Sequence, residues 1–320
     1  MKHFTTEPMH HIIETLKLEL QNSNTHDSIS FEVINPDCTV STYAGSIITY
    51  NECNYIYRGY KAWTDLAQLL FCKMLTPIKA SEHTVVISFQ KLDIEESFHK
   101  LDLNQRSEKY GVNSPFFSIN KNEEPSFVHA YLKALQAVKI SDRKSVLNLG
   151  VNSGDEFELI RETTENFSTI KFTGIDHCAS AISYAKKRFN TANMELIQHN
   201  INHLNELKLK RSELLISIGT LQSPGVDFKP LFMSLIQEYL TEDGAVILGF
   251  PNSRWIDGEM IYGAKAPNYS YSEMSLVIKD IYFCKKYLQQ HRFRVTLTGK
   301  DYIFLTATRI KKTTKKPLNL

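Results

Sequence analysis

Residues 145–157, with the sequence SVLNLGVNSGDEF, constrain the fold more than any other part of the chain. The segment starts as an apolar strand, turns at Gly150 and Gly154, and ends in acidic residues that suit a first helical turn. Such a turn leaves backbone N–H groups and the positive end of a helix dipole facing a ligand. The next apolar strand, KFTGID, ends in Asp176, where a carboxylate can accept both hydroxyls of a ribose. Together the two segments predict a site for a cofactor that carries a nucleoside.

Strand and helix patterns alternate through the C-terminal two thirds of the chain, which is typical of βαβ units and a parallel sheet. After Asp176 the expected elements are a helix over 179–190, the strands MELIQH and ELLISIG, a helix over 228–240, a turn over 241–244 and the buried strand AVILGF. The chain closes with a helix over 272–290 and two β runs, FRVTLT and YIFLTATRI, joined by a turn at 299–301. We therefore expect an α/β fold with a doubly wound, mostly parallel sheet and an antiparallel C-terminal hairpin.

The glycine turn does not have the G-x-G-x-x-G spacing of dinucleotide-binding proteins, because Asp155 stands where the third glycine would fall. It resembles motif I of class I S-adenosylmethionine-dependent methyltransferases, in which an apolar pair, an acid and an apolar residue precede G-x-G-x-G. Here Asn148 takes the place of the acid and Asn152 that of the middle glycine. Asparagine tolerates a positive φ better than other non-glycine residues, so the turn can survive the second change. The resemblance covers residues 124–310 and includes the closing hairpin.

The resemblance implies that S-adenosylmethionine is the cofactor and that it binds along the carboxyl ends of the strands. Asp176 would hold the ribose, Asn200 would reach the adenine amino group, and the backbone at Gly219 would pass under the transferable methyl. The alternatives are that Asp176 caps the helix after it and that Asn200 is a turn residue. The residues that the resemblance assigns to the cofactor are Asn148, Gly150, Asn152, Gly154, Asp176, His177, Asn200, Ile201, Gly219 and Thr220.

Two aromatic-rich segments could bind the substrate. In the first, Tyr57, Arg58 and Trp63 could hold an anionic or planar ligand, or could form a core edge around a satisfied arginine. The second is the long connection after AVILGF, and unusually long loops tend to be functional. Its candidate substrate residues are Arg254, Trp255, Tyr262 and Tyr269.

Tyr110, just before the predicted α/β domain, is expected either to close the cofactor site or to dock on that domain as a linker aromatic. A general base is needed only if the acceptor must lose a proton during transfer. The weak candidates for that catalytic role are Asp257, Glu259 and His199.

The length of 320 residues suits two units. We expect a smaller α+β module over 1–120, the cofactor-binding domain over 121–312 and a basic, disordered tail over 313–320. The module is predicted to contain a helix over 9–20, the strands ISFEVIN, TVSTY, SIITY and TVVISF, and a helix reaching Met74. Five widely spaced cysteines and the lack of a signal-like or membrane-length apolar run favour a cytoplasmic protein with reduced thiols, no metal and no membrane span.

The expected activity is methyl transfer to a small-molecule acceptor, since the net charge of only +2 gives no global field that would select nucleic acid. One alternative is an RNA methyltransferase. Another is a non-catalytic, methyltransferase-like binding or scaffold protein, suggested by Asn148 and Asn152. A nicotinamide-dependent oxidoreductase is the weakest alternative, because a plain dinucleotide-binding domain lacks the closing hairpin. The acceptor atom and the oligomeric state are not specified by the sequence.

Overall fold

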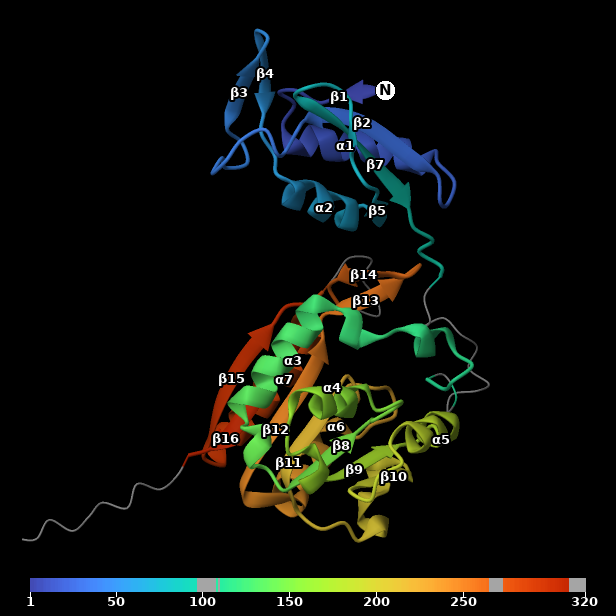
Figure 1. Ribbon diagram of the computed structural model, residues 1–320, viewed down its shortest axis with the longest axis vertical. Coiled ribbons are helices and arrows are strands. Elements are labelled where there is room, and N and C mark those ends of the chain that lie inside the picture. The colour runs from blue at the N-terminus through green and yellow to red at the C-terminus, as the bar shows by residue number, and fades with distance from the viewer. Residues whose placement is uncertain (97–107, 109, 265–272, 311–320) are drawn as a thin grey trace, which may run out of the picture. The chain divides into compact units, whose positions relative to one another are not determined.

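The computed structural model describes residues 1–96, 108, 110–264 and 273–310 (Figure 1). The chain divides into two compact units, the first made of residues 1–100 with 255–261 and the second of residues 101–254 with 262–320. Residues 110–123 lie in the second unit, where Tyr110 and Asn122 hydrogen-bond to Asn152 and Asp155, and residues 255–261 lie in the first, where Gln68 donates to the carbonyl of Met260. The expected boundary at 120 stays a prediction. The predicted tail lies outside the described residues.

The first unit is built on a mainly antiparallel sheet with the strand order β1-β2-β7-β5, in which β6 also pairs with β7. The strands are β1 (Lys2–His3), β2 (Ser28–Ile34), β5 (Cys72–Met74), β6 (Ile78–Lys79) and β7 (Thr84–Lys91). Its helices are α1 (Met9–Gln21) and α2 (Tyr60–Leu69), and β3 (Ile47–Tyr50) and β4 (Cys53–Ile56) form a separate hairpin. Alternate residues of β2, including Phe31, are buried against Trp63 of α2, as the period-2 pattern predicts.

Two local predictions for the first unit are wrong. The helix expected to reach Met74 ends at Leu69, because Phe71 has a left-handed φ of 53° and the chain turns there into β5. The segment TVSTY forms no strand in the described structure; its Val40 and Tyr43 are 92% and 85% exposed, so no neighbouring strand or core holds them.

The second unit contains a seven-stranded sheet with the order β10-β9-β8-β11-β12-β16-β15 (Figure 1). These strands are β8 (Ser145–Leu149), β9 (Lys171–Asp176), β10 (Met194–Gln198), β11 (Ser212–Ile218), β12 (Leu240–Pro251), β15 (Phe293–Gly299) and β16 (Tyr302–Arg309). The pairs from β10 to β12 are parallel, and β16 runs antiparallel to both β12 and β15. The predicted fold class, including the antiparallel closing hairpin, is confirmed.

Helices cover this sheet and bury both of its faces. They are α3 (Pro125–Ala137), α4 (Asp155–Thr163), α5 (Ala179–Arg188), α6 (Phe228–Ser234) and α7 (Ser275–Gln290). One core packs α3, α4 and α5 against Val146 of β8, and the other packs α6 and α7 against Leu147 and Leu149. Because successive residues of β8 point to opposite cores, the strand has to be apolar at nearly every position.

Two boundaries in the second unit differ from the sequence prediction. The helix expected over 228–240 is α6 followed by a π-helical turn, Leu235–Tyr239. Residues 241–244, expected as a turn, lie within β12, where the pairing with β11 shifts register between Ser212 and Leu214. Because the pairing with β11 is irregular there, the polar residues 241–244 can remain within β12 without ending the strand.

Candidate functional site

The glycine-containing turn between β8 and α4 is held in a conformation that only certain residues can adopt. Gly150, Asn152 and Gly154 have φ values of 76°, 44° and 87°, all in the left-handed region. A Cβ on Gly150 would lie 1.8 Å from Oγ1 of Thr220, and a Cβ on Gly154 would lie 2.4 Å from the ring of Phe189. At both glycines the close approach of a neighbour therefore excludes any side chain.

Asp176 joins this turn to the end of β9. Its Oδ2 accepts a hydrogen bond from the backbone N–H of Asn152 at 3.0 Å, and its Oδ1 accepts one from the N–H of Cys178 at 2.9 Å. The second bond fixes the backbone of Cys178, the N-cap residue of α5, but Asp176 does not itself cap the helix, which was the alternative to ribose binding. A carboxylate has about four acceptor sites, so these two bonds leave capacity for the hydroxyls of a ribose. Backbone bonding and ribose binding are therefore compatible at this one side chain.

Asn148 lies in the middle of β8, between Gly174 of β9 and Ile216 of β11. It is 1% exposed, and its Nδ2 has no hydrogen-bond partner among the described residues. A buried donor without a partner costs about 1–3 kcal/mol. The amide therefore suits a bound group that carries an acceptor, as the carboxylate of the methionine part of S-adenosylmethionine does.

The end of β11 meets the turn directly. The N–H of Gly219, which has a φ of 70°, donates to the carbonyl of Gly249 at 2.8 Å. The next residue, Thr220, packs its side chain against the Cα of Gly150. The structure thus brings Gly150, Asn152, Asp176 and Thr220 into one contiguous group at the carboxyl ends of β8, β9 and β11.

The residues predicted for the adenine side make other contacts than the group formed by Gly150, Asn152, Asp176 and Thr220. His177 is half exposed, with its Nδ1 3.4 Å from Oδ1 of Asp176. Asn200 is exposed, and its Oδ1 accepts the N–H of Asn202 at 3.0 Å, which is the turn role left open by the sequence. Ile201 is buried in the core beneath α6. Nε2 of His199 lies 2.9 Å from the carbonyl of His203, a local contact.

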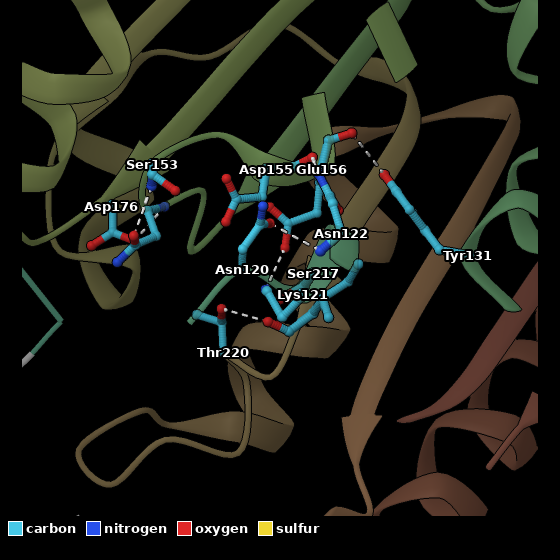
Figure 2. Close-up of polar contacts among 12 residues, drawn as sticks. Asn120, Lys121, Asn122, Tyr131, Ser153, Asp155, Glu156, Asp176, Ser217 and Thr220 are labelled. Carbon is cyan, nitrogen blue, oxygen red and sulfur yellow. Dashed lines mark hydrogen bonds and ion pairs between the residues drawn. The ribbon is translucent and has the colours of Figure 1, made fainter. Parts of the chain in front are cut away.

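A buried ion pair beside the turn was missed by the sequence prediction. Nζ of Lys121 lies 3.0 Å from Oε1 of Glu156 in the first turn of α4, and the two side chains are 15% and 4% exposed (Figure 2). Burial alone would lower the pKa of Lys121, but the charges of Glu156, Tyr302 and Asp155, together with the hydrogen bond to Glu156, outweigh it and raise that pKa. Nδ2 of Asn122 also donates to the carbonyl of Asp155 at 2.9 Å. The sequence signal was an acid at a helical position that packs inward.

The two acids proposed as catalytic bases are held by residues of the first unit. Oδ2 of Asp257 lies 2.7 Å from Nε2 of His26 and accepts the N–H of Asp93 at 2.9 Å. Burial would raise the pKa of Asp257, but these hydrogen bonds outweigh it and lower that pKa. Glu259 forms a 2.7 Å ion pair with Lys73. Both are in the hairpin of β13 (Ser253–Ile256) and β14 (Glu259–Tyr262), and a catalytic role for them stays a prediction.

The first substrate segment has the arrangement of a core edge. The guanidinium of Arg58 is buried, donates to the carbonyl of Glu7, and lies 5.7 Å from the ring centroid of the buried Trp63. Burial lowers the pKa of Arg58. The hydroxyl of Tyr57 donates to the carbonyl of Pro36 at 3.0 Å. These contacts satisfy the arginine within the first unit.

The second substrate segment is described only in part. Arg254 and Trp255 are half-buried, and burial lowers the pKa of Arg254. Tyr262 is 40% exposed, and its hydroxyl lies 3.7 Å from the sulfur of Met274. Tyr269 lies outside the described residues, and binding of substrate by this segment stays a prediction.

The described ranges also bear on metal, disulfide and membrane features. No group of three or more histidine, cysteine, aspartate or glutamate residues there could hold a metal ion. The five cysteines are free thiols. In the part of the chain that the structure describes, no helix has the length and apolar character to cross a membrane.

Comparison with known proteins gives one family match, over residues 140–295, to a family described as a methyltransferase domain. A SAM-dependent methyltransferase from Aquifex aeolicus is 14% identical, with a TM-score of 0.42 over 59% of this chain and 96% of that chain. The N-methyltransferase NodS from Bradyrhizobium japonicum, solved with S-adenosyl-L-homocysteine, is 13% identical, with a TM-score of 0.42 over 60% and 91%. Precorrin-6y C5,15-methyltransferase from Geobacter metallireducens is 10% identical, with a TM-score of 0.39 over 56% and 88%. No curated protein matched the chain.

Proposed function

Since residues 140–295 form a class I S-adenosylmethionine-dependent methyltransferase domain, we propose that this enzyme methylates a small-molecule acceptor. The observation that supports cofactor binding most directly is the turn between β8 and α4, whose backbone is tied to the carboxylate of Asp176. That carboxylate retains acceptor capacity beside a turn from which side chains are excluded at Gly150 and Gly154. A nucleoside with a charged substituent suits this combination.

The chemistry required of the protein is mainly alignment. When bound, S-adenosylmethionine supplies an activated methyl group. Asp176 would accept the ribose hydroxyls, and the turn from Gly150 to Gly154 would face the methionine part with the positive end of the α4 dipole. The buried amide of Asn148 would donate to an acceptor there. Holding the acceptor in line with the transferable methyl accounts for most of the rate gain that such a site can give.

A small acceptor is proposed because the charge of the chain is close to balanced. The net charge is +2, with 37 basic and 35 acidic residues, so long-range attraction of a polyanion would be weak. An RNA acceptor would need several phosphate contacts, and its binding would weaken steeply with added salt. Transfer of labelled methyl to RNA rather than to a metabolite extract would therefore overturn this part of the proposal.

The first test is calorimetric titration of the full chain with S-adenosylmethionine and S-adenosylhomocysteine. Wild-type protein should bind with a Kd in the micromolar range, or about −8 kcal/mol. Asp176→Asn, which keeps the shape but removes the charge, should weaken binding at least tenfold, as should Asp176→Ala. The matched control is Asp142→Ala, at an exposed aspartate in a turn before β8. Absence of binding by folded wild-type protein, or equal binding by all variants, would contradict the proposed site.

A further inference from the structure

The side chain of Asn152 makes a contact that the glycine of the motif could not make. Its Nδ2 donates to the backbone carbonyl of Tyr110 at 2.8 Å, across 42 residues of sequence. Its Oδ1 accepts the N–H of Ser153 at 2.7 Å, which fixes the orientation of the amide. The residue that departs from the motif therefore joins the cofactor turn to an earlier segment of the chain.

That segment, residues 110–118, is called the strap here. It is held a second time where α5 begins, because the N–H of Val112 donates to Oγ of Ser180 at 3.1 Å. Packing at this point is tight, since a Cβ on Gly111 would lie 2.4 Å from the same Oγ and 3.2 Å from the sulfur of Cys178. The strap thus lies on the residues that directly follow Asp176 in the chain.

Aromatic contacts hold the rest of the strap. The ring of Tyr110 packs edge-to-face on Phe116 with centroids 4.9 Å apart, and Phe117 does the same with Tyr184 of α5 at 4.9 Å. Burial, and in second place the charge of Asp176, raise the pKa of the Tyr110 phenol. Asn152 links Tyr110 to Asp176 directly, because its backbone N–H donates to Asp176 and its side chain donates to the carbonyl of Tyr110.

We infer that Asn152 is a positioning residue that fastens the strap over Asp176, so that Tyr110 forms one side of the ribose pocket and slows cofactor release. This inference rests on the proposed function, because the cofactor is what the strap would retain. Glycine at position 152 would allow the turn but leave the strap without its bond to the turn. Asparagine in place of glycine at position 152 thus adds a hydrogen bond between the turn and the strap.

Two variants separate this role from a general effect on the turn. Asn152→Gly keeps the left-handed φ and removes the side chain, whereas Asn152→Asp keeps the shape but replaces the donor by an acceptor that cannot bond to the Tyr110 carbonyl. The matched control is Asn166→Asp, because the amide of Asn166 also donates to a distant backbone carbonyl, that of Ser141 at 2.9 Å. Asn166 lies between α4 and β9.

Release of S-adenosylhomocysteine is measured by displacement in a stopped-flow instrument, and amide hydrogen exchange is followed at residues 110–118 without ligand. Both Asn152 variants should release the ligand about threefold to tenfold faster, as expected for loss of one hydrogen bond. Exchange at the N–H of Val112 should be faster by a similar factor, and Asn166→Asp should match wild type in both measurements. The inference would be overturned if both Asn152 variants released S-adenosylhomocysteine at the wild-type rate and exchanged the N–H of Val112 as slowly as wild type. Failure of the proposed function looks different, because wild-type protein would then bind no cofactor while the exchange experiment would still report on the strap.

Discussion

The buried pair of Lys121 and Glu156 provides the sharpest test of how the second unit is held together. With Nζ and Oε1 3.0 Å apart and the carboxylate 4% exposed, the attraction is about 5–6 kcal/mol at an effective dielectric constant of about 20, before desolvation is subtracted. The Lys121→Met variant leaves the carboxylate buried without a cation. Breaking a buried pair in this way costs about 3–5 kcal/mol. A loss of that size is a large share of the stability of an ordinary domain.

The double variant Lys121→Met/Glu156→Gln is the control, because it removes the unpaired charge along with the pair. It should recover most of the lost free energy of unfolding, since replacing both charges is often close to neutral. Urea unfolding followed by far-UV circular dichroism measures both variants. Because the pKa of Lys121 is raised on folding, its charge contributes fully to the free energy of unfolding at pH values below the unfolded pKa of about 10.4. That contribution is lost only as the pH rises through the folded pKa. A cost below about 1 kcal/mol for the single variant, as for a surface pair, or a double variant no more stable than the single one, would refute this reasoning.

Three further predictions concern other parts of the molecule. Because the pKa of Asp257 is lowered on folding, its stabilisation is present above the unfolded pKa of about 3.9 and is lost as the pH falls through the folded pKa. The free energy of unfolding, followed by tryptophan fluorescence, should therefore change less between neutral and acidic pH in Asp257→Asn than in wild type. Gly150→Ala should lower both the melting temperature and the cofactor affinity, because its Cβ would collide with Thr220. The control is Gly225→Ala, where φ is 90° and no described atom lies within 4 Å of the added Cβ. It should cost only about 1 kcal/mol of backbone strain in thermal melting. Asn148→Asp should lower the melting temperature without ligand, because it buries a carboxylate that has no cation. It should also enlarge the rise in melting temperature that S-adenosylmethionine produces, because the ammonium group of the cofactor would pair with that carboxylate. A rise equal to that of wild type would contradict this prediction.

Much of the second unit could be predicted from sequence because its strands are buried on both faces. A strand such as β8 sends side chains to two cores, so it reads as a continuous apolar run between turn signals. The alternation with helices then restricts the sheet to parallel order. The closing hairpin was visible because two β runs flank a glycine, and Gly299 has the expected left-handed φ of 97°.

Contacts between distant polar residues could not be predicted in the same way. Periodicity shows which face of an element is buried, but it does not show which partner meets a charged side chain there. Asp257 and Glu259 stood out as acids in a long connection, yet the structure pairs them with His26 and Lys73, far away in the sequence. The end of α2 depends on the left-handed Phe71, and an apolar residue at that position gives no turn signal.

The departures from the glycine motif follow the space available at each position. Glycine is kept at positions 150 and 154, where a Cβ would lie within 1.8 Å and 2.4 Å of neighbouring atoms. It is replaced at position 152, where the side chain has room to reach the carbonyl of Tyr110 and where asparagine tolerates the φ of 44°. Asn152 therefore adds a contact that a glycine could not make, and Nδ2 of Asn148, which has no partner among the described residues, is the point at which this chain's recognition of the methionine part is expected to differ from the motif.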